Sequence, residues 1–152
     1  MTFTRTFDYE VVREIMTHPK LYEHGADDYS PAREEFQPRE DAGIWYVRVD
    51  DAGELLGLFI LAPQTAVVWE IHTRLLPATW GAIAQTAARE ITPWVFSNIA
   101  SCRRLVTSVP AHNRLAIRFA ERAGMTRYGL NPASYLKRGR LADTVLLGIG
   151  PE

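Results

Sequence analysis

Alternating polar and apolar positions open the chain and predict strands in its first half. Residues 2–7 alternate and favour a short strand, after which Asp8 stands at the N-cap position of a helix. Residues 20–42, rich in proline, glycine and acids, predict an irregular surface segment with one helical turn near 31–36. Gly57 is expected at a bulge or a close approach. Three adjacent antiparallel strands follow from the β-branched and aromatic runs at 44–49, 55–61 and 65–73.

The hydrophobic period lengthens from two to about 3.6 after residue 77, which indicates helices in the second half. Residues 81–90 predict one helix, and Pro93 is placed to begin a second helical segment. A further helix is predicted at 113–123, with Gly124 as its C-cap. Strands are expected at 104–109, 125–130 and 143–149. The order predicts an α+β or mixed α/β fold, a sheet of six to seven strands with helices on its faces.

Composition limits the class of protein. The chain has 152 residues, 47% of them hydrophobic, which suits one globular domain over 1–152. A single cysteine excludes a disulfide framework and a cysteine zinc site, and we expect no metal. No apolar run is long enough to span a bilayer and no signal-peptide pattern opens the chain, so we expect a cytoplasmic protein without membrane partners.

The small net charge of −1 conceals an asymmetry along the chain. Residues 1–54 carry 6 Lys and Arg against 13 Asp and Glu, whereas residues 101–152 carry 9 against 3. Such a division predicts a surface that presents a basic region to one ligand and an acidic region to another, although solvated faces that merely segregate explain it as well. The overall charge argues against nucleic-acid binding.

A strand that leads through a tight loop into a helix, as predicted for residues 67–90, places unpaired backbone N–H groups at the helix N-terminus. Phosphate groups bind such places, and the small residues Ala78, Gly81 and Ala82 would let one approach the backbone. An ordinary helix start with a glycine in its first turn is the alternative.

Four residues near the C-terminus carry a family resemblance. Asn113, Ala116, Gly124 and Met125 match the pattern N-x-x-A-(x)7-G-[FM], in which an asparagine opens a helix and a glycine closes it. The pattern and the strand order resemble the GCN5-related N-acetyltransferase (GNAT) superfamily over most of the chain. The run from His72 to Pro77 also looks like small bacteriophage-encoded members of that superfamily.

The resemblance implies acetyl-CoA as acyl donor, bound in a V-shaped cleft between the fourth and fifth strands of a mostly antiparallel, twisted sheet. The implied cofactor-binding residues are Ile71 and Thr73 on the fourth strand, Leu76, Ala78, Thr79, Trp80, Gly81 and Ala82 in the pyrophosphate loop, and Asn113. The chain departs from the family at Ile83, where a small residue is usual, and at Ala120, where many members carry a tyrosine that protonates the leaving thiolate.

Three residues are candidates for the chemistry. Glu70 and His72 are two apart on a predicted strand and therefore share a face, where they could remove a proton from an attacking amine. A glutamate on the fourth strand often acts as general base in the family. Tyr135 could replace the missing acid. The alternatives are a Glu70 carboxylate that only pairs with Arg74 or another cation, a histidine that only orients the loop, and a tyrosine that only packs.

These features together predict an N-acetyltransferase that transfers an acetyl group from acetyl-CoA to a primary amine, with a cationic acceptor favoured by the acidic first third. The alternative is a catalytically degenerate GNAT-fold module for binding or assembly, of the bacteriophage-encoded kind. A homodimer is compatible with the four tryptophans, although core packing also explains them.

Overall fold

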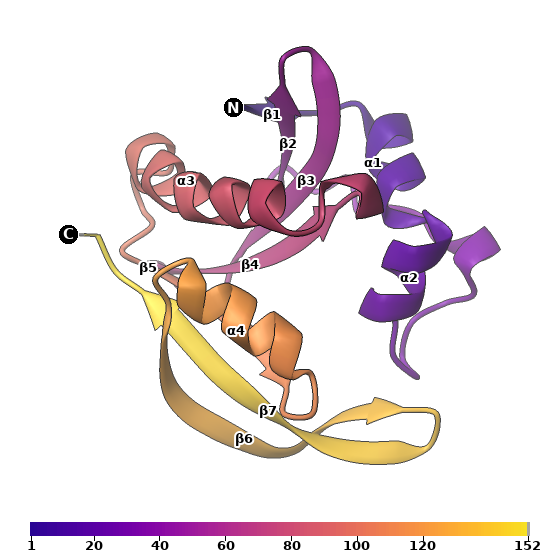
Figure 1. Cartoon of the computed structure of the whole chain (residues 1–152). Helices are drawn as coiled ribbons and strands as arrows, with labels where there is room; N and C mark the ends of the chain where they lie inside the picture. Colours follow the sequence, from indigo (N-terminus) through magenta and orange to yellow (C-terminus); the bar gives the residue numbers. More distant parts are fainter. Residues whose placement is uncertain (152) are drawn as a thin grey trace.

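The computed structural model describes residues 1–151. Its first half contains β1 (Thr2–Thr6), α1 (Tyr9–Met16), α2 (Pro19–Gly25), the 3-10 turn η1 (Arg33–Glu35), β2 (Trp45–Asp51), β3 (Glu54–Pro63) and β4 (Val68–Leu75). Its second half contains the 3-10 turn η2 (Pro77–Thr79), α3 (Ala82–Asn98), β5 (Arg104–Pro110), α4 (Arg114–Arg122), β6 (Thr126–Lys137) and β7 (Arg140–Ile149) (Figure 1). The predicted mixed α/β class is confirmed.

A seven-stranded sheet in the order β1-β2-β3-β4-β5-β7-β6 forms the centre of the molecule. Every neighbouring pair is antiparallel except β4 and β5, which run parallel. These two strands pair only from Val68 to Glu70 on β4 and from Arg104 to Val106 on β5, although both continue further. The two strands therefore part beyond Glu70, and the sheet opens as a V at its centre.

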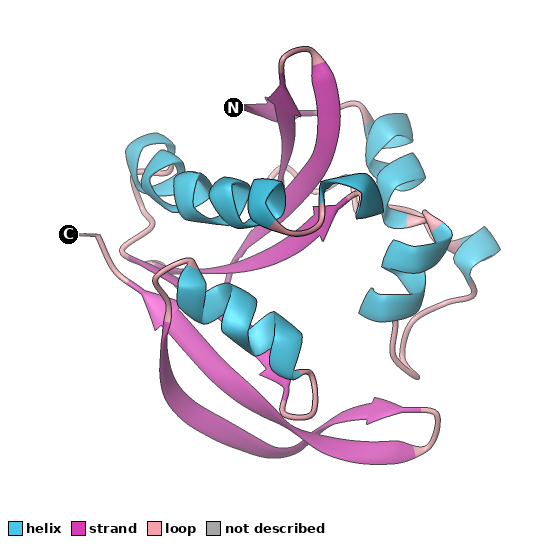
Figure 2. Ribbon diagram, in the orientation of Figure 1, coloured by secondary structure: helices cyan, strands magenta, loops and turns pink. Residues whose placement is uncertain are grey.

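Helices cover both faces of the sheet. Figure 2 shows α3 and α4 side by side over one face, where their apolar residues pack on strand residues such as Phe59, Trp69 and Leu105. On the opposite face, Val12 and Ile15 of α1 pack with other buried residues of α2, β2 and β3. Trp69, Trp45 and Trp94 form edge-to-face contacts in and beside the larger core, whereas Trp80 is 48% exposed.

Two prolines behave differently from the sequence expectation. Pro19 begins α2, and the rest of this helix falls within residues 20–42, which were predicted to be irregular. The helix starts here because His18 caps it and Pro19 needs no amide partner in the first turn. Pro93 lies inside α3, which runs unbroken from Ala82 to Asn98, so the predicted second segment is wrong. The flanking residues Thr92 and Val95 are buried against the sheet, and this packing outweighs the lost hydrogen bond.

The last two strands are longer than the sequence indicates. The basic segment 135–140 was expected between strands, yet β6 reaches Lys137 and β7 begins at Arg140. The hairpin tip is tied to the segment after α2: the Asp28 carboxylate accepts hydrogen bonds from the backbone N–H groups of Arg138 (2.7 Å) and Gly139 (2.9 Å). Figure 1 shows this hairpin reaching toward α2 beside the parted strands.

None of the helices in residues 1–151 is both long and apolar enough to cross a membrane. No group of three or more His, Cys, Asp or Glu side chains in this part of the chain is arranged to hold a metal ion.

Candidate active site

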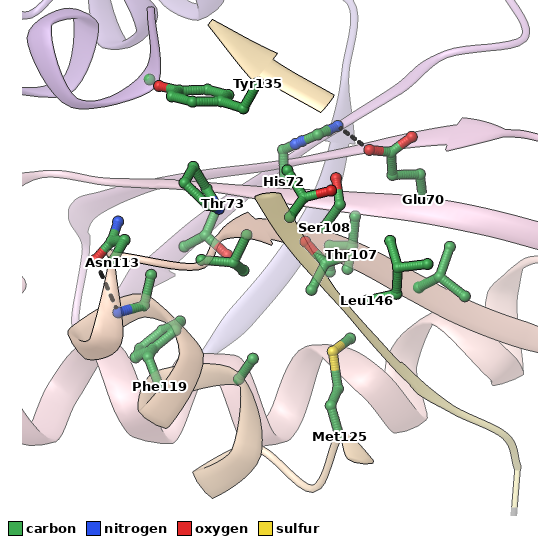
Figure 3. Close-up of a pocket in the computed structure, with 18 of the residues that line it drawn as sticks. Glu70, His72, Thr73, Thr107, Ser108, Asn113, Phe119, Met125, Tyr135 and Leu146 are labelled. Carbon is green, nitrogen blue, oxygen red and sulfur yellow. Dashed lines mark hydrogen bonds and ion pairs between the residues drawn. The ribbon is translucent and has the colours of Figure 1, made fainter. Parts of the chain in front are cut away.

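A cavity of about 1170 Å³ lies where β4 and β5 part. On one face of the sheet it is lined by α3 and α4 residues such as Ile91, Phe119 and Ala120, and on the other by Glu70, His72 and Tyr135. Figure 3 shows Tyr135 and the Glu70–His72 pair on one side of the opened sheet and Phe119 on the other. The cavity therefore passes through the sheet, and two ligands could enter it from opposite faces.

Glu70 and His72 form an interacting pair at this cavity. His72 Nε2 lies 3.1 Å from Glu70 Oε1, and Gln64 Nε2 donates a 2.7 Å hydrogen bond to Glu70 Oε2. The side chains of Glu70 and His72 are 24% and 39% exposed. The pKa of Glu70 lies below its ordinary value, mainly because His72 donates a hydrogen bond to the carboxylate. Burial of the carboxylate raises the pKa, but by less than the hydrogen bond lowers it. The alternative Glu70–Arg74 ion pair does not form.

Tyr135 reaches the same cavity from β6. Its ring centre lies 6.3 Å from that of His112, another lining residue. Burial raises the pKa of the Tyr135 hydroxyl, and the negative charges of Asp27 and Asp28 raise it further. At neutral pH the hydroxyl is therefore firmly protonated.

The backbone of β4 is open on its cleft side. The carbonyl of Val67 accepts hydrogen bonds from the backbone N–H groups of Arg103 (2.8 Å) and Arg104 (3.1 Å), so odd-numbered residues of this strand present their backbone groups toward β5. Ile71 and Thr73 follow in this series but lie beyond the last paired residue, and both line the cavity. The last parallel bridge, Glu70 with Val106, uses the Ile71 N–H, and the Thr73 carbonyl accepts a hydrogen bond from Arg74 Nη1. The Ile71 C=O and the Thr73 N–H are therefore the groups left free to bind a ligand in the cleft.

The pyrophosphate loop expected from the resemblance lies beside the cavity, and none of Leu76, Ala78, Thr79, Trp80, Gly81 or Ala82 lines it in the part of the chain described. Trp80 Nε1 donates to the Leu75 carbonyl at 2.9 Å, and its ring stacks on His24 with centres 5.6 Å apart. Thr79 is buried and donates to the Leu76 carbonyl. The loop could therefore offer a phosphate the backbone N–H groups of the first turn of α3 rather than these side chains.

Two features of this loop leave room for a ligand. Gly81 adopts φ +108° in open space, because a Cβ built there meets no atom within 4 Å. Ile83, which replaces the usual small residue, is 46% exposed.

Asn113 lines the cavity and also caps a helix. Its side-chain Oδ1 accepts a hydrogen bond from the backbone N–H of Ala116 at 3.2 Å, at the N-terminus of α4. Gly124 ends the same helix with φ +103°, and Ala120 is buried. The family pattern therefore has a local structural reason at Asn113 and Gly124.

Sequence reasoning missed several lining residues. Ser108 and His112 come from β5 and the loop after it, and Arg74 from the end of β4. The sequence suggested Arg74 only as an ion-pair partner of Glu70, although alternation along β4 puts residues 70, 72 and 74 on one face of the strand and could have placed Arg74 in the cavity as well. The positions of Ser108 and His112 in the cavity depend on the parallel pairing of β5 with β4, which no local sequence pattern reveals.

Comparisons with known proteins give a consistent answer. The model of the acetyltransferase (GNAT) domain family matches residues 2–126. A search of curated proteins found no match. Among solved structures, a spermidine N-acetyltransferase from Vibrio cholerae in complex with CoA and spermine is 18% identical, with a TM-score of 0.73 over 98% of this chain and 94% of that one. A ribosomal-protein-alanine N-acetyltransferase from Brucella melitensis is 12% identical, with a TM-score of 0.74 over 99% of this chain and 100% of that one.

Proposed function

The chain belongs to the GNAT family of acetyl-CoA-dependent N-acetyltransferases, and from this premise we propose that it acetylates a primary amine that arrives as a cation. Acetyl-CoA supplies the acetyl thioester. Its pantetheine amides would pair with the free backbone groups of Ile71 and Thr73, and its phosphates would meet the first turn of α3. The acceptor would enter from the opposite face, past Glu70, His72 and Tyr135.

The Glu70–His72 pair is suited to remove the proton of the acceptor ammonium. Glu70 alone is a weak base, because its pKa lies below the ordinary value. It can instead hold His72 by Nε2, which leaves Nδ1 of a neutral imidazole with a lone pair for the amine proton. The Glu70 carboxylate would then stabilise the imidazolium that forms, as a carboxylate does wherever it orients a catalytic histidine.

Tyr135 is suited to the opposite proton transfer. The neutral amine forms a bond to the carbonyl carbon of the thioester, and the carbon–sulfur bond then breaks. The departing sulfur needs a proton, and the Tyr135 hydroxyl holds one at neutral pH because its pKa is raised. The second proton that the nitrogen loses as the amide forms would restore the Tyr135 hydroxyl. This role would compensate for Ala120, which occupies the position of the usual tyrosine.

The proposed cationic acceptor rests on two carboxylates of the cavity lining. Glu23, Asp27 and Glu70 line the cavity together with the cations Arg74, Lys137 and Arg138, and Glu23 forms an ion pair with Arg138. Asp27 and Glu70 are therefore the carboxylates left to attract an ammonium group. The Vibrio cholerae structure, which holds spermine, supports an acceptor that arrives as an ammonium ion.

The observation that carries the proposal is the Glu70–His72 pair beside the free edge of β4. Thiol release from acetyl-CoA, measured over a panel of primary amines, tests it with Glu70→Gln and His72→Gln. We expect kcat to fall by about 10²-fold or more in each variant, since general acid–base catalysis contributes about 10²–10⁴-fold. The KM for acetyl-CoA should change little.

Glu121→Gln is the matched control, because Glu121 pairs with Arg127 outside the cavity. Its kcat should equal that of the wild type. Undiminished kcat in Glu70→Gln and His72→Gln would remove the pair from the mechanism.

A further inference from the structure

Arg74 is the cationic side chain next to the proposed base on β4. It follows His72 by two residues and therefore lies on the same strand face, about 7 Å further along the strand. It lines the main cavity and also a side pocket of about 110 Å³. Arg74 is the only charged residue that lines this side pocket within the described chain.

The guanidinium of Arg74 lacks an anionic partner. No carboxylate in residues 1–151 lies within 4.0 Å of it, whereas Arg48, Arg127 and Arg138 each have one. Its one protein hydrogen bond runs from Nη1 to the Thr73 carbonyl at 2.9 Å, which uses one of five N–H donors. Burial without a compensating charge lowers the pKa of Arg74.

The position of this guanidinium is fixed by close packing on α2. A Cβ built on Gly25 would lie 2.8 Å from Arg74 Nη2 and 3.1 Å from its Cζ, so the guanidinium rests directly against the glycine backbone. The Arg74 nitrogens without hydrogen-bond partners are not sealed off from the cavity. Among the side chains of residues 1–151, only Arg5 Nε is both fully buried and without a hydrogen-bond partner. A held, desolvated cation with free donors facing a cavity is a site for an anion.

We propose that Arg74 binds a carboxylate carried by the acceptor amine, so that the acceptor is an amino acid-like molecule with its amine at His72 and its anionic end at Arg74. This inference rests on the proposed function, because it assigns the second contact of the same acceptor. The spacing along β4 suits a carbon chain of a few atoms between the two groups. A second ammonium group at this position would instead be repelled by Arg74.

Calorimetric binding in the presence of CoA tests this assignment without turnover. The probes are the unbranched ω-amino acids from glycine to δ-aminovalerate, with the amino alcohol and the diamine of matching length. We expect the wild type to bind at least one amino acid tenfold or more tightly than its amino alcohol and its diamine. Arg74→Gln should abolish this preference, and Arg74→Lys should restore part of it.

Two further variants separate binding from folding. Gly25→Ala should displace the guanidinium and weaken the preference, because the added methyl group meets only the end of a flexible side chain. Arg104→Gln is the matched control: Arg104 packs on Gly148 in the same manner, yet it lies outside the cavity. Its probe preference should equal that of the wild type.

The outcomes distinguish the two proposals. Equal binding of amino acids and amino alcohols, no amino acid binding, or a preference that survives Arg74→Gln would overturn the Arg74 site. A change confined to CoA affinity in Arg74→Gln would also overturn it, and would assign Arg74 to the CoA phosphates. Arg74-dependent carboxylate binding without any thiol release would instead contradict the proposed function and leave the anion site standing.

Discussion

We expect Gly57→Ala to lower the free energy of unfolding more than alanine at any other glycine near the site. Gly57 lies on β3 beside the end of β4, next to a bulge where the register shifts between Val49 and Asp50. A Cβ built there would stand 2.4 Å from the Arg74 carbonyl oxygen and 2.6 Å from Leu75 Cα. Both atoms belong to the backbone, so a side-chain rotation cannot relieve the contact. The residue also adopts φ +143°, which L side chains rarely adopt.

The expected cost has two parts. Overpacking a filled site costs about 1–3 kcal/mol, and backbone strain of this kind costs about 1–3 kcal/mol. Their combined value of about 2–6 kcal/mol is a large part of the total stability of an ordinary domain, about 5–15 kcal/mol. For a chain of this length the middle of that range lowers Tm by about 8–16 °C.

The assay is urea unfolding with thermal unfolding in parallel, and Gly53→Ala is the control. Gly53 lies in the same hairpin with φ +81°, yet a Cβ built there meets no atom within 4 Å. We therefore expect only the strain, about 1 kcal/mol, in Gly53→Ala. Equal destabilisation in the two variants would refute the reasoning, because it would show that β4 yields to the added methyl group without loss.

Three further predictions follow from single contacts. Asn113→Ala should lose about 1 kcal/mol of unfolding free energy because the cap on Ala116 is removed, whereas Asn113→Asp should keep the cap; equal stabilities in urea would contradict the capping role. The pKa of Glu70 is lower in the folded protein than in the unfolded chain, where it is about 4.3. Its carboxylate therefore stabilises the fold at a pH above the unfolded pKa, and this stabilisation is lost as the pH falls through the folded pKa. Glu70→Gln should therefore reduce stability at neutral pH and progressively less below about pH 4, and a difference independent of pH would refute this sign. Asp28→Asn should speed amide exchange at Arg138 and Gly139, since one acceptor oxygen is lost; unchanged exchange would show that the hairpin tip is held by other contacts.

Alternation along β4 was enough to place the central pair. Glu70 and His72 share a face because strand side chains alternate, and the structure brings them to 3.1 Å. The same rule assigns Arg74 to that face, but it does not reveal that no carboxylate in residues 1–151 lies within 4.0 Å of the guanidinium. The absence of a partner depends on α2, whose Gly25 covers Arg74.

The side chains of the cofactor loop could not be placed from the sequence. Trp80 turns its indole nitrogen to the Leu75 carbonyl and its ring to His24, which belongs to α2. The segment that contains α2 was predicted to be irregular because proline and glycine are frequent in it. Because α2 was not predicted from the sequence, neither the contact of Trp80 with His24 nor the packing of Arg74 on Gly25 could be predicted.

The two prolines show why local rules diverge. Pro19 occupies the first turn of α2, where its missing N–H has no cost, and sequence rules foresee this arrangement only once a helix is assumed. Pro93 lies inside α3, where the rules predict a break. The burial of Ile91 and Val95 against the sheet keeps that helix continuous, and such tertiary packing is invisible in a local window.

The spatial order of the last three strands could not be predicted from the sequence either. The strand β7 inserts between β5 and β6, so the two edge strands of the sheet are β1 and β6. The tip of this hairpin is held by Asp28, 110 residues away from Arg138 in the chain. Contacts of such separation carry no local sequence signal, and they determine how Tyr135 reaches the cavity.

The central claim is that the free edge of β4 binds acetyl-CoA, and amide hydrogen exchange at single-residue resolution tests it most directly. The backbone N–H of Thr73 has no β5 partner, so it should exchange quickly in the free protein. At saturating acetyl-CoA the account predicts strong protection of this amide, with the amides of Trp69 and Ile71, which the bridges to β5 already pair, unchanged. Equal exchange at Thr73 with and without acetyl-CoA would contradict it.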